Sequence, residues 1–202
     1  MSDLREQLQQ LLQGRVCLMG LGNVDHGDDG FGVRLVEALK SEGRRPKAEG
    51  NSTQVIVCGT TPERFISRVA DDGFDHVIFF DAVDFRGAPG STVLLNSDEM
   101  AARFPQISTH KLSLGLLARQ VEANGRTKAW LLGVQPESLR PGERLSPTVR
   151  ATLKLLLELT AEVSLVGRAV LCAPHAPQTP NSTTSRRAED CAPYRGGLEV
   201  PA

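Results

Sequence analysis

The fold class follows most directly from one segment, His76-Val77-Ile78-Phe79-Phe80-Asp81. Four consecutive apolar residues without polar alternation are typical of a strand that is buried on both faces of a parallel sheet. The run stops at Asp81, so we expect this carboxylate at the carboxyl end of the strand. The segment therefore predicts an α/β protein, with an acidic side chain at the sheet edge where such proteins bind ligands.

The rest of the chain supplies the other elements of such a fold. Apolar segments predict further strands at 15–20, 53–58, 92–95 and 128–134. Amphipathic periodicity and capping residues predict helices at 3–13, 30–40, 61–73, 97–103, 109–124 and 146–165, with N-caps at Thr61, Ser97, Thr109 and Ser146. We therefore predict a three-layer α/β sandwich, with a mainly parallel, twisted five-stranded sheet and helices on both faces.

Two regions of different composition divide the chain. We assign residues 1–167 to a single α/β domain and expect residues 168–202 to form a disordered tail. Within the second region, residues 172–202 hold five of the 12 prolines and almost no bulky apolar side chains. Such a segment cannot bury enough apolar surface to offset the entropy cost of ordering it.

Composition argues against several classes of function. The chain has 202 residues with 23 basic and 24 acidic side chains, a formal net charge of −1, so it lacks the basic excess that nucleic-acid binding requires. No apolar run approaches the roughly 18 residues that span a bilayer, and the first residues do not resemble a signal peptide. The 4 cysteines form no C-x-x-C pair, which argues against a structural zinc site or disulfide framework. We expect a cytoplasmic protein without membrane insertion, and a monomer because no heptad seam is present.

The richest candidate for chemistry is the glycine-rich loop after the first strand, residues 20–32. It contains Gly22, Asn23, Asp28 and Asp29, whereas Asp25 stands where a dinucleotide-binding loop needs its third glycine. Acidic side chains would also repel a pyrophosphate. A helix N-terminus is the simplest alternative role for Asp28, because carboxylates stabilise the helix dipole there.

Three residues are predicted to converge at the carboxyl edge of the sheet. Asp81 ends its strand, the Asp28-Asp29 pair lies in the loop after the first strand, and His110 stands at the start of a helix, from which it can point to the same edge. Two carboxylates that converge without a base between them imply a shared proton or a divalent cation. The addition of an imidazole suits zinc or nickel, while turn and capping roles remain the alternatives for each residue alone. His26 is interpreted as a supporting residue of the loop.

With these residues in hand, the chain resembles the hydrogenase maturation proteases, the endopeptidases that trim the large subunit of nickel-iron hydrogenases. The resemblance rests on six collinear motifs between about Val16 and Leu159: Gly20-x-Gly22-Asn23 with Asp28-Asp29-Gly30-x-Gly32-Val33-Arg34, Cys58-Gly59-Thr60-Thr61-Pro62-Glu63, Phe80-Asp81-Ala82, Ser108-Thr109-His110-Lys111-Leu112, Gly133-Val134-Gln135-Pro136-Glu137, and Leu145-Ser146-Pro147-x-Val149. Each motif is weak alone, and their order makes the set specific. One departure is Val57-Cys58-Gly59, where many relatives have an acidic residue and two glycines.

The resemblance implies an activity and a role for each candidate residue. The substrate would be the nickel-loaded precursor of a hydrogenase large subunit, from which a C-terminal extension is removed. Asp29, Asp81 and His110 would be the catalytic and metal-binding residues. Nickel would be supplied by the substrate, and zinc or another divalent ion could substitute. The remaining residues would support the loop or line the cleft: Gly22, Asn23, Asp28, Gly59 and Thr60.

Two other functions are compatible with parts of the sequence. A nickel-dependent binding or chaperone module for hydrogenase assembly could use the same three residues without cutting its partner. Peptidyl-tRNA hydrolases also begin with a strand that ends in Gly20-Leu21-Gly22-Asn23, although they need a basic face that this chain lacks.

Overall fold

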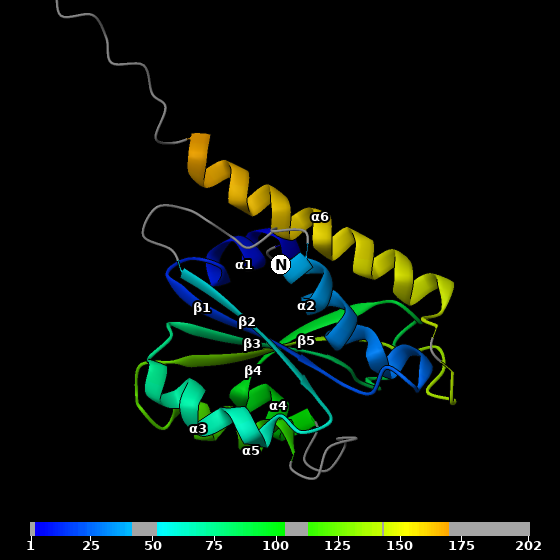
Figure 1. Ribbon diagram of the computed structural model, residues 1–202, viewed down its shortest axis with the longest axis horizontal. Helices are drawn as coiled ribbons and strands as arrows, with labels where there is room; N and C mark the ends of the chain where they lie inside the picture. The colour runs from blue at the N-terminus through cyan, green and yellow to red at the C-terminus, as the bar shows by residue number, and fades with distance from the viewer. Residues whose placement is uncertain (1–2, 42–51, 104–112, 143, 170–202) are drawn as a thin grey trace, which may run out of the picture. The chain divides into compact units, whose positions relative to one another are not determined.

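Five strands form one mixed sheet in the computed structural model, which describes residues 3–41, 52–103, 113–142 and 144–169 (Figure 1). The strand order is β2-β1-β3-β5-β4, and β4 alone runs antiparallel to its neighbour. This confirms the predicted mainly parallel five-stranded sheet. The strands are β1 (Arg15–Leu21), β2 (Ser52–Gly59), β3 (His76–Ala82), β4 (Thr92–Asn96) and β5 (Lys128–Val134).

Strand β3 is the centre of the sheet. It pairs in parallel with β1 on one side, where Gly20 lies opposite Phe80, and with β5 on the other, where Gly133 lies opposite Asp81. Residues 77–82 are all buried. The apolar run in the sequence is therefore explained by a strand that has neighbours on both edges and helices on both faces.

Helices cover both faces of the sheet and complete the predicted three layers. One core joins one face to three helices, and a second core joins the opposite face to three others (Figure 1). The first set comprises α3 (Glu63–Asp72), α4 (Ser97–Arg103) and α5 (Leu114–Glu122), and the second comprises α1 (Leu4–Leu11), α2 (Phe31–Ser41) and α6 (Pro147–Ala169). A short 3-10 turn, η1 (Gly27–Gly30), leads into α2.

Three of the predicted N-caps are wrong, by one to four residues. Asn96, not Ser97, caps α4, because its side chain accepts from the Glu99 N–H and the Glu99 carboxylate accepts from the Asn96 N–H. Helix α5 is capped by Ser113 rather than Thr109. The N-cap position of α3 is occupied by Pro62 rather than Thr61, without a side-chain cap.

The predicted start of the last helix is confirmed. The Ser146 hydroxyl accepts from the Val149 N–H at 3.4 Å, and Pro147 is the first residue of α6. Proline suits this position because the first N–H of a helix has no partner within the helix.

All described residues belong to one unit of the chain, Met1–Cys172, and the second unit is Ala173–Ala202. Helix α6 runs to Ala169, two residues past the predicted domain boundary. The predicted tail lies almost entirely outside the described residues, which end at 169. Among the helices that the structure describes, none combines the length and apolar character needed to cross a bilayer.

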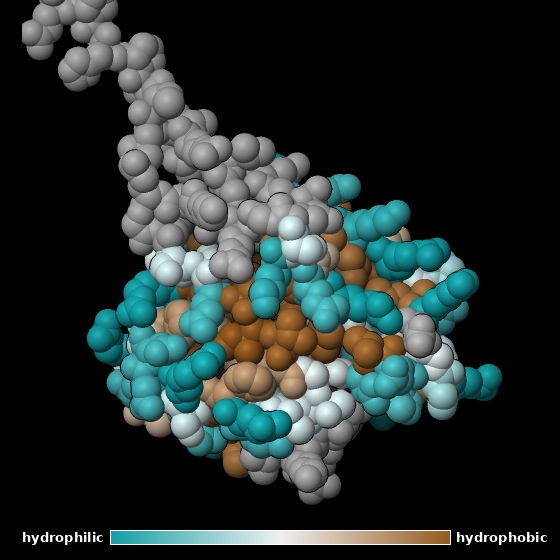
Figure 2. Space-filling view, in the orientation of Figure 1, coloured by the Kyte–Doolittle hydropathy of each residue, from teal (hydrophilic) through white to brown (hydrophobic). Residues whose placement is uncertain are grey.

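Strand β2 forms one edge of the sheet and carries apolar surface. Figure 2 shows this surface in the middle of the face on which β2 runs in Figure 1. Val57, near the carboxyl end of β2, is 37% exposed. The carboxyl end of β2 is also where the candidate site begins.

Candidate functional site

A backbone hydrogen bond between two glycines links the carboxyl ends of β1 and β2. Gly22 has a φ of 110°, and its N–H donates to the Gly59 carbonyl at 3.0 Å. A Cβ atom at this position would collide with the Asp29 carbonyl oxygen. Only glycine therefore allows the loop to fold back over the end of β1.

A second glycine brings the start of α2 against the end of β3. A Cβ atom at Gly32 would collide with the carbonyl oxygen of Phe80, the residue before Asp81. Asp29 precedes this contact by three residues, so both acidic segments lie at the same edge of the sheet. This is the convergence that the sequence predicts for the two backbone segments.

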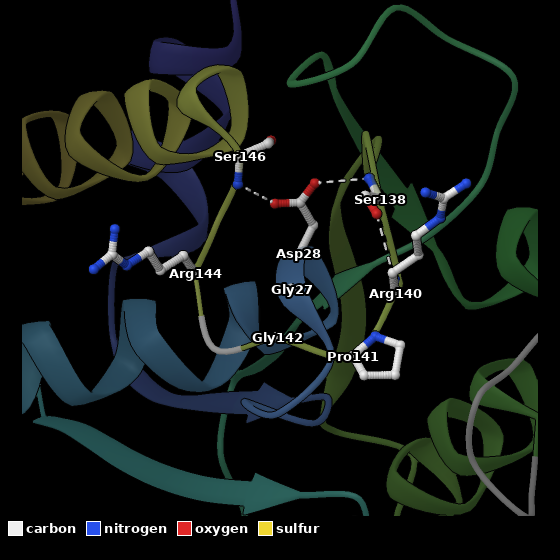
Figure 3. A pocket seen from close by; sticks show the side chains of 8 residues that line it. All are labelled: Gly27, Asp28, Ser138, Arg140, Pro141, Gly142, Arg144 and Ser146. Atoms are coloured by element: carbon white, nitrogen blue, oxygen red, sulfur yellow. Dashed lines mark hydrogen bonds between the residues drawn. The ribbon is translucent and has the colours of Figure 1, made fainter.

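Asp28 anchors the loop that follows β5. Its carboxylate is 1% exposed and accepts three backbone N–H bonds, from Glu137 at 2.9 Å, Ser138 at 3.1 Å and Ser146 at 2.6 Å. Figure 3 shows the carboxylate between Ser138 and Ser146, in the wall of a pocket of about 500 Å³ that Arg140 and Arg144 also line. Both oxygens of this group, which we call the Asp28 anchor, are occupied in holding the loop.

Asp29 occupies a different environment. Its Oδ2 accepts from the Asn23 N–H at 2.8 Å, but its Oδ1 is buried and has no hydrogen-bond partner among the described residues. The residue is 5% exposed and lines a cavity of about 300 Å³. We call this space the Asp29 cavity; its lining residues are Asn23, His26, Asp29, Thr60 and Leu139. A buried carboxylate oxygen without a partner is costly, so this atom fits a cation or a protic group of a ligand.

Asp81 stands at the end of β3, 1% exposed, and its Oδ1 accepts from the Ala82 N–H at 2.9 Å. Side chains alternate along a strand, so Asp81 lies on the same face as Phe79, which packs in the core with α3, α4 and α5. Asp81 is not among the residues that line the Asp29 cavity. Asp29 and Asp81 thus lie at one edge of the sheet, but of the two residues only Asp29 lines the Asp29 cavity.

The third predicted ligand, His110, lies outside the described residues, which resume at Ser113. Within the described parts of the chain there is no group of three His, Cys, Asp or Glu side chains that could hold a metal ion. The Asp29, Asp81 and His110 metal set therefore stays a prediction.

The predicted supporting residues lie in two places, at the Asp29 cavity and at the pocket beside Asp28. Asn23 and Thr60 line the Asp29 cavity with Asp29 itself. Gly22 and Gly59 form a backbone hydrogen bond with each other beside this cavity. Asp28 faces the other pocket and carries the loop after β5.

Two residues of the cavity were not among the predicted site residues. His26 was interpreted as a supporting residue, although its position three residues before Asp29 was a usable signal. Leu139 lies in a loop without periodicity, and it is 42% exposed. No local pattern marks such a residue, because its partners come from the other end of the domain.

The two cysteines in the described residues are packing residues, as their apolar neighbours in the sequence indicate. Cys17 and Cys58 are buried and free. Burial raises the pKa of the Cys58 thiol to about 12 and also raises the pKa of Cys17. Both thiols stay protonated near neutral pH, so neither is a nucleophile.

The side chain of Gln135 has a structural role in the turn that follows β3. Its Oε1 accepts from the Phe85 and Gly87 N–H groups, and its Nε2 donates to Asp84 at 3.1 Å. Hydrogen bonds from the Arg86 N–H and from Gln135 lower the pKa of Asp84. Gln135 thus holds the turn after β3 in place beside the site.

The family model for hydrogenase maturation proteases matches residues 33–163, well over half of the chain. The chain belongs to the hydrogenase maturation proteases. It is 34% identical over 148 residues to the hydrogenase 2 maturation protease of Escherichia coli strain K12, which covers 71% of this chain and 87% of that protein. The family assignment favours a hydrolase of the protease class over the peptidyl-tRNA hydrolase that the first strand alone allowed.

Solved structures of hydrogenase maturation proteases share the fold. The [NiFe] hydrogenase maturation protease HycI from Thermococcus kodakarensis superposes with a TM-score of 0.67 at 29% identity, over 79% of this chain and 99% of that one. The hydrogenase maturating endopeptidase HybD from E. coli gives a TM-score of 0.61 at 32% identity, over 77% and 93% of the two chains. The chain is therefore an endopeptidase of hydrogenase maturation.

Proposed function

We propose that this hydrogenase maturation protease removes a C-terminal extension from the nickel-loaded precursor of a nickel-iron hydrogenase large subunit. The observation that carries the proposal is the Asp29 carboxylate, which is buried with one oxygen unpartnered in a cavity at the carboxyl edge of the sheet. The names of the relatives support the class of substrate, because they are maturation proteases of hydrogenases.

Nickel enters this proposal as part of the substrate. Asp29, Asp81 and His110 would engage the ion that the precursor already holds, and no cysteine contributes to the set. Carboxylates and one imidazole bind free nickel only moderately, which suits a site completed by the substrate's own ligands. Zinc or another divalent ion would occupy the same donors in vitro.

The side chains would act by binding and orientation. The two carboxylates would place the scissile peptide against the ion, and the ion would supply polarisation of either the peptide carbonyl or a water molecule. Hydrolysis consumes one water and releases a carboxylate on the mature subunit and an amine on the extension. Leu139 and Thr60 would line the approach of the peptide to Asp29.

The test is the intact mass of the large subunit in cells that express it with and without this protease, in nickel-replete and nickel-depleted medium. We expect a mass decrease that requires both the protease and nickel. Asp81→Asn should abolish the decrease while the fold is kept, because the replacement keeps size and removes charge. Asp71→Asn, on the exposed side of α3, is the matched control and should process normally.

Two outcomes would overturn the proposal. A nickel-dependent complex without any mass decrease would identify a binding or chaperone module instead of an enzyme. A mass decrease that persists without nickel would show that the ion is not recognised.

A further inference from the structure

The Asp29 cavity contains a second buried polar atom without a partner. Nδ1 of His26 is inaccessible to solvent and makes no hydrogen bond with any described residue, and Oδ1 of Asp29 is in the same condition. Both residues line the one cavity. Unpaired buried polar atoms are rare in native proteins, so two of them on residues that line one cavity point to a ligand that supplies the missing partner.

The backbone fixes His26 and Asp29 in a single tight turn. The His26 N–H donates to the Asn23 carbonyl at 3.1 Å, and the Asp29 N–H donates to the His26 carbonyl at 3.1 Å. His26 also forms a bridge with Gly142 of the loop that the Asp28 anchor holds. The backbone of His26, three residues before Asp29, is therefore held by two parts of the chain.

The other groups of the cavity do not satisfy these two atoms. The Asn23 side-chain oxygen already accepts from the Asp25 N–H at 3.0 Å. Leu139 is apolar and Thr60 supplies one hydroxyl. A carboxylate oxygen and an imidazole nitrogen are together satisfied by a divalent cation, and an imidazole ligand favours nickel, cobalt or zinc over magnesium or calcium.

We propose that His26, through Nδ1, is a metal ligand that acts with Asp29 on the divalent ion handled at this cavity. Two protein ligands leave coordination positions for the substrate and for water. The identification of that ion with the substrate's nickel rests on the proposed function, whereas binding of an ion to His26 does not.

The experiment uses the full-length purified chain and zinc ions, which are diamagnetic. Two-dimensional ¹H–¹⁵N spectra of the histidine rings report the chemical shift of each ring nitrogen, and a nitrogen that binds zinc changes its shift. We expect zinc to shift Nδ1 of His26, assigned with His26→Gln, and to leave His76 at the amino end of β3 unchanged. The key signal is read in the wild-type chain, and the variant serves only to assign it.

Calorimetry with cobalt provides the second measurement. His26→Gln should weaken cobalt binding at least tenfold, while the control His76→Gln keeps wild-type affinity, and magnesium should not compete. A His26 ring unchanged at saturating zinc, or equal cobalt affinity of wild type and His26→Gln, would overturn the inference, because water then satisfies the buried atoms. Processing of the large subunit in cells separates the two proposals: cleavage without zinc binding at His26 removes only this inference, and zinc binding at His26 without cleavage removes only the proposed function.

Discussion

Asp28 and Asp29 are adjacent in the sequence and both are buried, yet their carboxylates differ in how many hydrogen-bond partners they have. The Asp28 anchor uses both carboxylate oxygens on three backbone N–H groups of the loop after β5. Asp29 uses one oxygen on the Asn23 N–H and leaves the other unpartnered in its cavity. The Asp28 carboxylate therefore holds a loop in place, whereas the Asp29 carboxylate has one oxygen that can still accept a ligand.

The local geometry makes this division possible. Both residues lie in the 3-10 turn η1, where successive side chains are about 120° apart around the axis. Asp28 therefore faces the loop that leads to α6, and Asp29 faces the turn after β1. A single turn of chain thus separates a carboxylate with partners on both oxygens from one with an unpartnered oxygen.

The largest expected effect comes from breaking the anchor. Asp28→Asn replaces one acceptor oxygen with an NH2 group, which cannot accept from the backbone N–H groups of this buried site. We expect the free energy of unfolding to fall by about 3 kcal/mol, measured by urea denaturation. Asp25→Asn, an exposed change in the same loop, should stay within about 0.5 kcal/mol. Equal stability of the two variants would show that the anchor is not structural.

The turn beneath Asp29 should be nearly as sensitive. Gly22→Ala forces a side chain into a φ of 110° and onto the Asp29 carbonyl oxygen. We expect a loss of about 2 kcal/mol or more. Gly125→Ala is the matched control, because Gly125 has a φ of 70° but no atom within 4 Å of the added Cβ. If both variants lose the same stability in urea, the close approach to Asp29 contributes nothing.

A smaller effect, the ionisation of buried thiols, limits the pH range in which the stabilities of these variants can be compared. The thiol pKa of Cys58 rises from 9.0 to about 12 in the folded chain, and burial also raises that of Cys17. Above pH 9 the unfolded chain therefore binds fewer protons than the folded chain, and stability falls as pH rises. The expected slope is up to about 1.4 kcal/mol per pH unit for each thiol. Urea denaturation between pH 8 and 11 should show a shallower decline for Cys58→Ala, and parallel curves would contradict burial as the cause.

The smallest change in stability is expected at Asp29, together with the complete loss of cleavage. In Asp29→Asn the remaining carbonyl oxygen can still accept from the Asn23 N–H, and the substitution also removes an unpaired buried charge. We expect the free energy of unfolding to stay within about 1 kcal/mol of wild type. A destabilisation as large as that of Asp28→Asn would mean that both carboxylates are structural.

The fold was predictable where a local pattern carries long-range information. The apolar run of β3 marked the central strand because only a strand covered on both faces lacks polar residues. The caps of α4 and α5 were missed by one and four residues, since Ser97 next to Asn96 and Thr109 before Ser113 are residues that could cap equally well by type. The choice among them depends on how the preceding segment packs, and the sequence does not show this.

By itself, the sequence determined the order of the elements, the sheet edge that bears the acidic residues and the family to which the chain belongs. Only the tertiary structure distinguished Asp28 from Asp29 and placed His26 and Leu139 in the Asp29 cavity. The physical reason is sequence separation: the partners of Asp28 lie more than 100 residues away, at Glu137, Ser138 and Ser146. A motif records which side chains are present, and folding decides which of their atoms are left without a partner.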